Sequence, residues 1–272
     1  MAKLYGIYKL IMDIINILFP LYFLFTAYLY YITIFNTEFQ NFFTIISLSI
    51  PIFYIITYFL FNILSKSFIS ITPNHKKIYV VKNYVKSVYL LLICLYSITI
   101  IKQVVLLNVD LKLAKLLAIT YFLNDLFALY IFYFLGLITK LPTSTILHHI
   151  ASSTAGFITL TKIDNTIDIK MLILLYGFFS CMSFVVNIYL GYRIYTKTDW
   201  IKYYFVVISY WVYLITLILN WCVQIYLMYF TLQFNIFYGL YIIFLIFIGQ
   251  DDIVLLKYLW NQSKDIWNEL KN

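Results

Sequence analysis

Long apolar segments with almost no charge recur along the whole chain. A transmembrane helix needs about 20 consecutive apolar residues, whereas a membrane-barrel strand needs about 9–11 residues that alternate with polar ones. The segments here are continuous and helix-sized, so the sequence predicts an all-α fold, a polytopic transmembrane helix bundle. We place eight spans, or seven if the short fifth does not cross, at Leu10–Thr33, Phe43–Leu64, Tyr84–Leu107, Lys115–Ile138, Ser144–Thr161, Met171–Gly191, Tyr203–Leu227 and Phe234–Leu256.

The composition indicates the same class of protein. Of 272 residues, 64% are hydrophobic and 11% are charged, against about 45–50% and about 25% in soluble proteins. With 19 basic and 11 acidic residues, a soluble domain of this size could not cover its surface with charge. The three cysteines, Cys94, Cys181 and Cys222, all lie inside apolar segments, so we expect no disulfides.

The basic residues are unevenly distributed between the two sides of the predicted membrane. With eight spans and a cytosolic N-terminus, 14 of them fall on the cytosolic side and 5 on the other. Cytosolic loops carry an excess of Lys and Arg, so this bias predicts that both termini are cytosolic. The net charge of +8 is therefore a topology signal, and we expect no nucleic-acid partner.

The chain divides into three predicted parts. They are a signal-anchor span with its loop at 1–42, a transmembrane domain at 43–230, and a last span with a short cytosolic tail at 231–272. We expect Ser65–Lys86 to be the one extended polar loop. The tail Lys257–Asn272 carries Trp260 and Trp267, which is typical of a short helix at the membrane interface.

Asp125 is the clearest ionisable residue at membrane depth, about 15 Å from the outer end of its span at 1.5 Å per residue. An acid in this position is costly and is by default a candidate for function. Asn124 beside it is a candidate for lipid binding or packing. The alternative is a structural hydrogen bond from Asp125 to a neighbouring helix.

Two adjacent histidines, His148 and His149, open the fifth predicted span and are followed by Ser152 and Ser153. One imidazole could act as a general base for an amine or hydroxyl that attacks an activated acyl group. The alternative is a pair of interfacial histidines hydrated by headgroups. With only three histidines in the chain, we expect no bound metal and no cofactor.

Three other polar sites are predicted to be structural. Asn187 lies among small residues of the sixth span and could bond across a close helix contact. Arg193, the only arginine, is predicted to anchor a helix end among phosphates. Asp251 and Asp252 end the last span, where we expect a solvated boundary.

Depth along the helices argues against contact between Asp125 and the histidines. Measured from the inner end of each span at 1.5 Å per residue, Asp125 lies about 20 Å deep and His149 about 8 Å deep. The gap of about 12 Å is too large for a hydrogen bond between upright helices. Only tilt, shifted span ends or a re-entrant fifth segment would close it.

The combination of these motifs resembles the TLC-domain family, which includes the ceramide synthases, the translocation-associated membrane proteins and smaller members linked to membrane lipid composition. The motifs are Asn124–Asp125–Leu126 and His148–His149–Ile150 in successive spans, with Asn187 in the next. The resemblance runs from Phe43 to the seventh span and is closer to the smaller members. The longer ceramide synthase signature is absent, because no histidine follows His149.

The resemblance implies a site at Asp125, His148 and His149, with Asn187 less directly, and residence in the endoplasmic reticulum. Our leading hypothesis is a membrane protein that influences lipid composition, with a lipid cavity between spans four to six and membrane lipids as partners. One alternative is a sphingoid-base N-acyltransferase, with acyl-CoA as a substrate. Another is a non-enzymatic cargo receptor or chaperone of the secretory pathway. Under each hypothesis the protein could form a homo- or hetero-oligomer.

Overall fold

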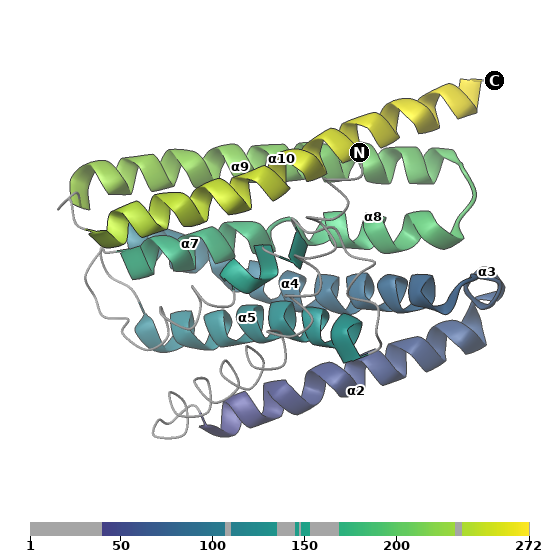
Figure 1. Ribbon diagram of the computed structural model, residues 1–272, viewed down its shortest axis with the longest axis horizontal. Coiled ribbons are helices and arrows are strands. Elements are labelled where there is room, and N and C mark those ends of the chain that lie inside the picture. The colour runs from purple at the N-terminus through teal and green to yellow at the C-terminus, as the bar shows by residue number, and fades with distance from the viewer. Residues whose placement is uncertain are drawn as a thin grey trace, which may run out of the picture.

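The computed structural model describes residues 40–106, 110–134, 145–146, 148–152, 169–231 and 236–271, and these residues form helices and no strand. The helices are α2 (Gln40–Leu64), α3 (Lys66–Ile69), α4 (Asn74–Val105), α5 (Leu111–Phe134), α7 (Ile169–Cys181), α8 (Phe184–Tyr195), α9 (Trp200–Thr231) and α10 (Ile236–Lys271) (Figure 1). Residues 148–152 add a short helical segment. The all-α prediction is confirmed for this part of the chain.

Four of these helices are long and apolar enough to cross a membrane: α2, α4, α5 and α9. A fifth span results if α7 and α8, which meet at an angle of 45°, are counted together. An all-helical fold with four or five helices that could cross a membrane is therefore confirmed for the described residues, whereas eight spans and cytosolic termini remain predictions. The segment Leu10–Thr33 and most of Ser144–Thr161 lie outside the described residues.

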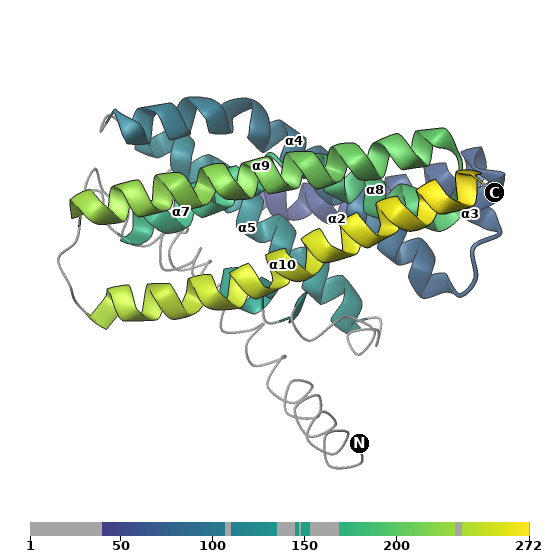
Figure 2. The same ribbon diagram turned by 90° about the horizontal axis from the view of Figure 1, so that it is seen from above.

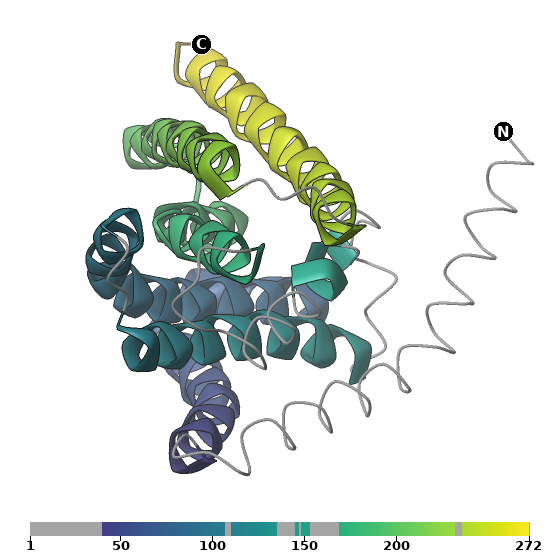
Figure 3. The same ribbon diagram turned by 90° about the vertical axis from the view of Figure 1, so that its left-hand side faces the viewer.

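The helices lie in layers, from α2, through α4 and α5, to α7 and α8, and then to α9 and α10 (Figures 1 and 3). Helix α4 packs against α2, α5, α7 and α8, and α9 packs against α7, α8 and α10. Of the most apolar 18-residue segment of α5, 72% is buried inside the protein, whereas only 11% of the corresponding segment of α2 is buried. Helix α5 is therefore an interior helix, whereas α2 presents most of its apolar surface outward.

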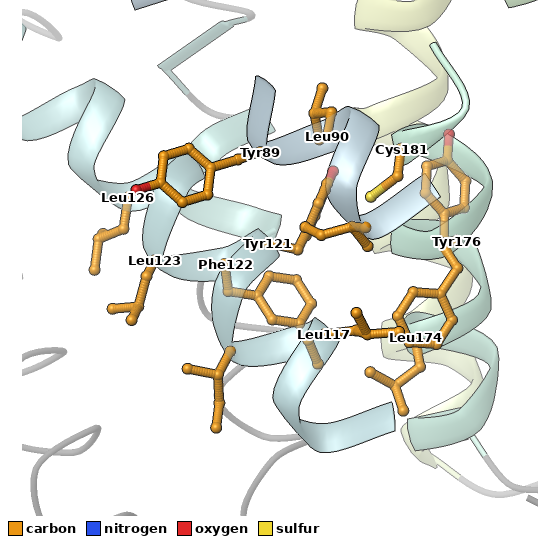
Figure 4. Packing of buried hydrophobic residues seen from close by; sticks show 14 of the residues in the cluster. Tyr89, Leu90, Leu117, Tyr121, Phe122, Leu123, Leu126, Leu174, Tyr176 and Cys181 are labelled. Atoms are coloured by element: carbon orange, nitrogen blue, oxygen red, sulfur yellow. The ribbon is translucent and has the colours of Figure 1, made fainter. Parts of the chain in front are cut away.

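The apolar core around the site is formed where α5 lies between α4 and α7. Figure 4 shows Tyr121 and Phe122 of α5 beside Leu90 of α4 and Leu174 of α7. All four side chains are at most 7% exposed. Because lipid tails are as apolar as these residues, the association depends on close van der Waals packing.

Three chain segments predicted to lie on one side of the membrane do lie at one end of the bundle. Helix α3, the turn between α8 and α9, and the C-terminus are together in Figures 1 and 2. Trp200, Trp260 and Trp267 belong to this end, and Trp200 and Trp267 are in edge contact with ring centroids 5.8 Å apart. Aromatic residues of this kind are enriched at membrane interfaces.

Two predictions about this end are wrong. Ser65–Lys86 is not an extended loop, because α3 occupies Lys66–Ile69 and α4 starts at Asn74. The tail is not a separate short helix, because α10 continues without a break to Lys271. In both cases, hydropathy ends the predicted span where polar residues begin, although the helix continues through them.

A glycine allows α8 to approach α4 closely. A Cβ atom at Gly191 would lie 2.9 Å from the Tyr84 ring, and 3.4 Å from the Val80 carbonyl oxygen. Beyond this contact, the hydroxyls of Tyr84 and Tyr195 are 2.6 Å apart. Gly191 therefore fixes how near α8 lies to the part of α4 that carries the site.

Candidate functional site

Asp125 lies at the centre of a buried polar cluster formed with α4 and the 148–152 segment. Its side chain is fully buried. One oxygen, Oδ1, accepts a hydrogen bond from Lys86 Nζ at 2.6 Å. The other, Oδ2, accepts one from Ser152 Oγ at 2.6 Å and lies 2.8 Å from His149 Nδ1. Both oxygens are thus engaged, as a buried charge requires.

Lys86 was not identified from the sequence as a site residue. It lies twelve positions into α4 and its side chain is 14% exposed. A local signal was present, since Lys82, Asn83 and Lys86 follow helical spacing directly before an apolar run. Such spacing places polar side chains on one face of a helix. Lys86 was missed because these lysines were assigned to a cytosolic loop when the positive-inside rule was applied.

The sequence leaves contact between Asp125 and His149 open, since tilt, shifted span ends or a re-entrant fifth segment would be needed to bring the two side chains together. The two side chains are in contact, and Ser152, one turn after His149, reaches the same carboxylate. The 148–152 segment therefore passes α5 at the level of Asp125. The depth calculation assumed upright helices and a fifth span that begins at the inner surface.

His148 points to a different carboxylate. Its Nδ1 lies 3.7 Å from Asp251 Oδ2 of α10. The rings of His148 and His149 are nearly perpendicular, with centroids 5.5 Å apart. The two adjacent histidines therefore join α5 on one side to α10 on the other.

The solvated boundary predicted at the end of the last span is wrong for Asp252. This residue is 5% exposed and accepts hydrogen bonds from the hydroxyls of Tyr176 and Tyr213. The sequence held a signal here too, because the apolar run continues at Ile253 after the two acids. Asp251 and Asp252 therefore lie in the middle of α10, not at its end.

A pocket of about 330 Å³ adjoins both histidines. It lies between α4, α7, α8 and α10, and Tyr121 is the contribution of α5. The lipid cavity between spans four to six remains a prediction, and the pocket observed here is bordered by α4 and α10 as well. Its ionisable lining residues are Lys82, Lys86, His148, His149, Arg193, Asp251 and Asp252.

Some of the remaining predicted residues line this pocket, and others do not. Asn187 and Arg193 of α8 both line it, so Arg193 does more than anchor a helix end. Asn124 is buried next to Asp125, and neither polar atom of its side chain has a hydrogen-bond partner within the described part of the chain. Ser153 lies outside the described residues.

Asp125, His148 and His149 could in principle bind a metal ion, since each offers one ligand atom and these atoms lie within 4.8 Å of one another. Two imidazoles and one carboxylate suit several transition metals. Here the Lys86 ammonium already pairs with the carboxylate, and a cation beside it would be repelled. These residues are therefore better suited to a pair in which Asp125 orients the His149 imidazole than to a metal centre.

Comparisons with known proteins identify no relative, because no protein-family model, curated protein or solved structure matches the chain.

Proposed function

We propose that the chain is a multi-pass membrane protein that acts on membrane lipids in the pocket beside Asp125. The observation that carries this proposal is the buried contact of Asp125 with Lys86, His149 and Ser152, of which Lys86 and His149 line a cavity of about 330 Å³. Buried ionisable clusters inside a helical bundle mark substrate sites more often than packing. The lipid is the substrate that a membrane pocket meets at highest concentration.

The resemblance to the TLC-domain family supports this proposal. The motif residues Asp125, His148 and His149 belong to the one cluster beside the pocket. Under this proposal the protein resides in the endoplasmic reticulum or a related membrane and influences membrane lipid composition.

The contact between Asp125 and His149 favours acyl transfer as the reaction. A carboxylate on Nδ1 orients an imidazole so that Nε2 can accept a proton. The nitrogen or oxygen of an amine or alcohol would bond to the carbonyl carbon of an acyl thioester while His149 takes its proton. The carbon–sulfur bond then breaks, and the thiolate leaves as a thiol with that proton. Acyl-CoA is the thioester proposed, with a sphingoid base as the amine.

Lipidomics of cells with and without the protein tests the broader proposal. We expect the abundance of at least one lipid class to change, and the His149→Ala variant to behave like the deletion. The matched control is His75→Ala, which changes the histidine at the start of α4 that does not line the pocket. An unchanged lipid profile in the deletion would contradict the proposal.

Purified protein with sphingoid base and acyl-CoA tests the reaction. We expect an N-acylated product, and a rate reduced by about 10²–10⁴ in His149→Ala, which is the usual contribution of a general base. Asp125→Asn should also reduce the rate, while His75→Ala should not. If the protein forms no product but still alters cellular lipids, acyl transfer is wrong and the broader proposal stands.

A further inference from the structure

Helices α9 and α10 carry two clusters of aromatic rings near the end of the bundle where the C-terminus lies (Figures 1 and 2). Each cluster contains two tryptophans and one tyrosine: the first is Trp200, Tyr203 and Trp267, and the second is Tyr210, Trp211 and Trp260. In the first, the three ring centroids are 5.3–6.0 Å apart. In the second, the Tyr210 centroid lies 5.4 Å from that of Trp211 and 5.3 Å from that of Trp260.

The two clusters are separated by a fixed distance along the helices. Tyr203 of α9 pairs with Trp267 of α10. Seven residues further along α9, Tyr210 pairs with Trp260, which lies seven residues earlier on α10. This pairing is that of two antiparallel helices, and seven residues extend about 10.5 Å at 1.5 Å per residue. The rings of the two clusters therefore face each other across a gap.

A pocket of about 240 Å³ occupies this gap. Its lining includes Val207 and Ser263, which lie between the clusters and have side chains too small to fill the space that the rings fill on either side. Ligand pockets usually begin at about 300 Å³, so this one suits part of a headgroup and not a whole lipid. It shares no lining residue with the pocket beside the histidines.

The position of the rings is suited to binding a cation. A point midway between the clusters lies about 5 Å from each along the helix axis, and a cation is attracted to an aromatic face within about 6 Å of the ring centroid. Two rings of this groove already bind cations. The Lys264 ammonium lies 4.7 Å from the Trp260 centroid. The Lys271 ammonium lies 4.5 Å from the Trp267 centroid.

The lining favours a quaternary ammonium over a primary one. Of the eight residues that line the pocket, all in the described part of the chain, none carries a carboxylate. A primary ammonium has three N–H donors, and it would lose its hydration here without an ionised acceptor in return. A trimethylammonium group has no donor to satisfy, and its attraction to aromatic faces needs no hydrogen bond.

Lys264 adds a positive charge at the wall of the pocket. Its contact with the Trp260 ring leaves that charge in place. A trimethylammonium group alone would be repelled by the lysine, whereas a phosphate joined to it by a short link would be attracted. A phosphocholine headgroup has this arrangement of charges. Tryptophans such as those at this end of the bundle are typical of the membrane interface, where headgroups lie.

We propose that the groove between α9 and α10 binds the phosphocholine headgroup of a membrane lipid, with its trimethylammonium group between the two aromatic clusters and its phosphate against Lys264. The groove is separate from the pocket beside the histidines. The inference therefore goes beyond the proposed function and does not depend on it.

The test is competitive lipid binding to the full-length protein, purified in a detergent without phosphate or choline groups and measured by native mass spectrometry. The probes are dioleoyl phosphatidylcholine, dioleoyl phosphatidylethanolamine and dioleoylglycerol, which share their acyl chains. We expect phosphatidylcholine to bind about tenfold more tightly than either of the others, as desolvated cation–π contacts predict. Equal or tighter binding of phosphatidylethanolamine overturns the proposal.

Two variants assign the preference to this groove. Val207→Phe fills the gap between the clusters and Trp260→Leu removes one of its walls, so each should abolish the preference for phosphatidylcholine. Tyr204→Leu is the matched control, because Tyr204 is a 59% exposed aromatic residue of α9 that does not line the pocket. If Trp260→Leu does not fold, Val207→Phe decides. A preference that survives in folded Val207→Phe overturns the proposal.

Lys264→Gln tests where the phosphate lies. We expect it to weaken phosphatidylcholine about threefold, as the loss of an exposed ion pair predicts, and not to weaken soluble tetramethylammonium, which the lysine repels. Lys257→Gln, at an exposed position of the same helix outside the pocket, should change neither. Unchanged or tighter binding of phosphatidylcholine to Lys264→Gln overturns the phosphate contact.

Soluble phosphocholine distinguishes a lipid from a free metabolite as the ligand. It should displace phosphatidylcholine only at far higher concentration than the lipid, because it lacks the acyl chains that the bilayer face of the groove can contact. Displacement at equal concentration overturns the assignment to a membrane lipid.

Discussion

Two buried carboxylates, Asp125 of α5 and Asp252 of α10, are stabilised by different partners. Asp125 pairs with an ammonium, a hydroxyl and an imidazole. Asp252 accepts hydrogen bonds from two tyrosine hydroxyls. One carboxylate is therefore held by charge compensation and the other by neutral hydrogen bonds.

The difference has energetic consequences. Removing one partner of a buried ion pair leaves an uncompensated charge in a medium of low dielectric constant. Removing one neutral donor leaves the carboxylate with its second donor, and the loss is that of one hydrogen bond. The two clusters should therefore respond very differently to substitutions that each remove a single contact.

The largest effect is expected for Lys86→Met, which leaves the Asp125 carboxylate without its cation. We expect the free energy of unfolding in detergent to fall by about 3–5 kcal/mol. The double variant Lys86→Met/Asp125→Leu should recover most of this loss, because no buried charge remains. Lys66→Met, which changes an exposed lysine of α3, is the matched control. An equal loss in the single and double variants would show that packing of the lysine stem, rather than charge, is the cause.

A smaller effect is expected for Tyr176→Phe or Tyr213→Phe, each of which removes one hydroxyl from Asp252. Hydrogen bonds to charged groups contribute about 1.5–3 kcal/mol, so we expect each variant to lose about this much unfolding free energy. Tyr204→Phe, at a 59% exposed position of the same α9 that carries Tyr213, should be neutral. A loss as large as that of Lys86→Met would remove the distinction between the two clusters.

The smallest effect is expected for Ser152→Ala. Asp125 keeps its lysine and its histidine, so the loss should lie at the low end of the about 1.5–3 kcal/mol that a hydrogen bond to a charged group contributes. The measurement is again unfolding in detergent, with the exposed Ser67→Ala as its control. A loss above about 3 kcal/mol would indicate that Ser152 holds the 148–152 segment in place and does not only donate to Asp125.

The sequence predicted the helical class correctly, and it singled out Asp125, the acid at the centre of the buried polar cluster. Helices α2, α5 and α9 follow directly from apolar runs, because a span of about 20 apolar residues has few alternatives. Asp125 stood out because an acid inside such a run is rare. Both inferences depend only on local composition, which the sequence contains in full.

The partners of Asp125 could not be predicted in the same way. Whether His149 reaches Asp125 depends on where one segment passes another, and helix tilt and crossing are set by packing that has no local signature. Lys86 was counted as a loop charge, because α4 begins at Asn74, ten residues before the predicted start of the span at Tyr84. The end of the last span was placed too early in the same way, so Asp252 was predicted to lie at a solvated boundary although it is buried.

The break between α7 and α8 determines where the arginine of the pocket lies. Met182 and Ser183 donate backbone hydrogen bonds to the carbonyls of Phe179 and Ser180, three residues back, so the helix tightens and turns by 45°. The twelve residues of α8 extend roughly 18 Å at 1.5 Å per residue, so this turn displaces their far end by roughly 13 Å from the line of α7. Because Arg193 lies near the far end of α8, a change of a few degrees in this bend would shift its guanidinium by a distance that matters for a hydrogen bond. The position of Arg193 in the pocket therefore depends on the backbone at Met182 and Ser183, almost the full length of α8 away.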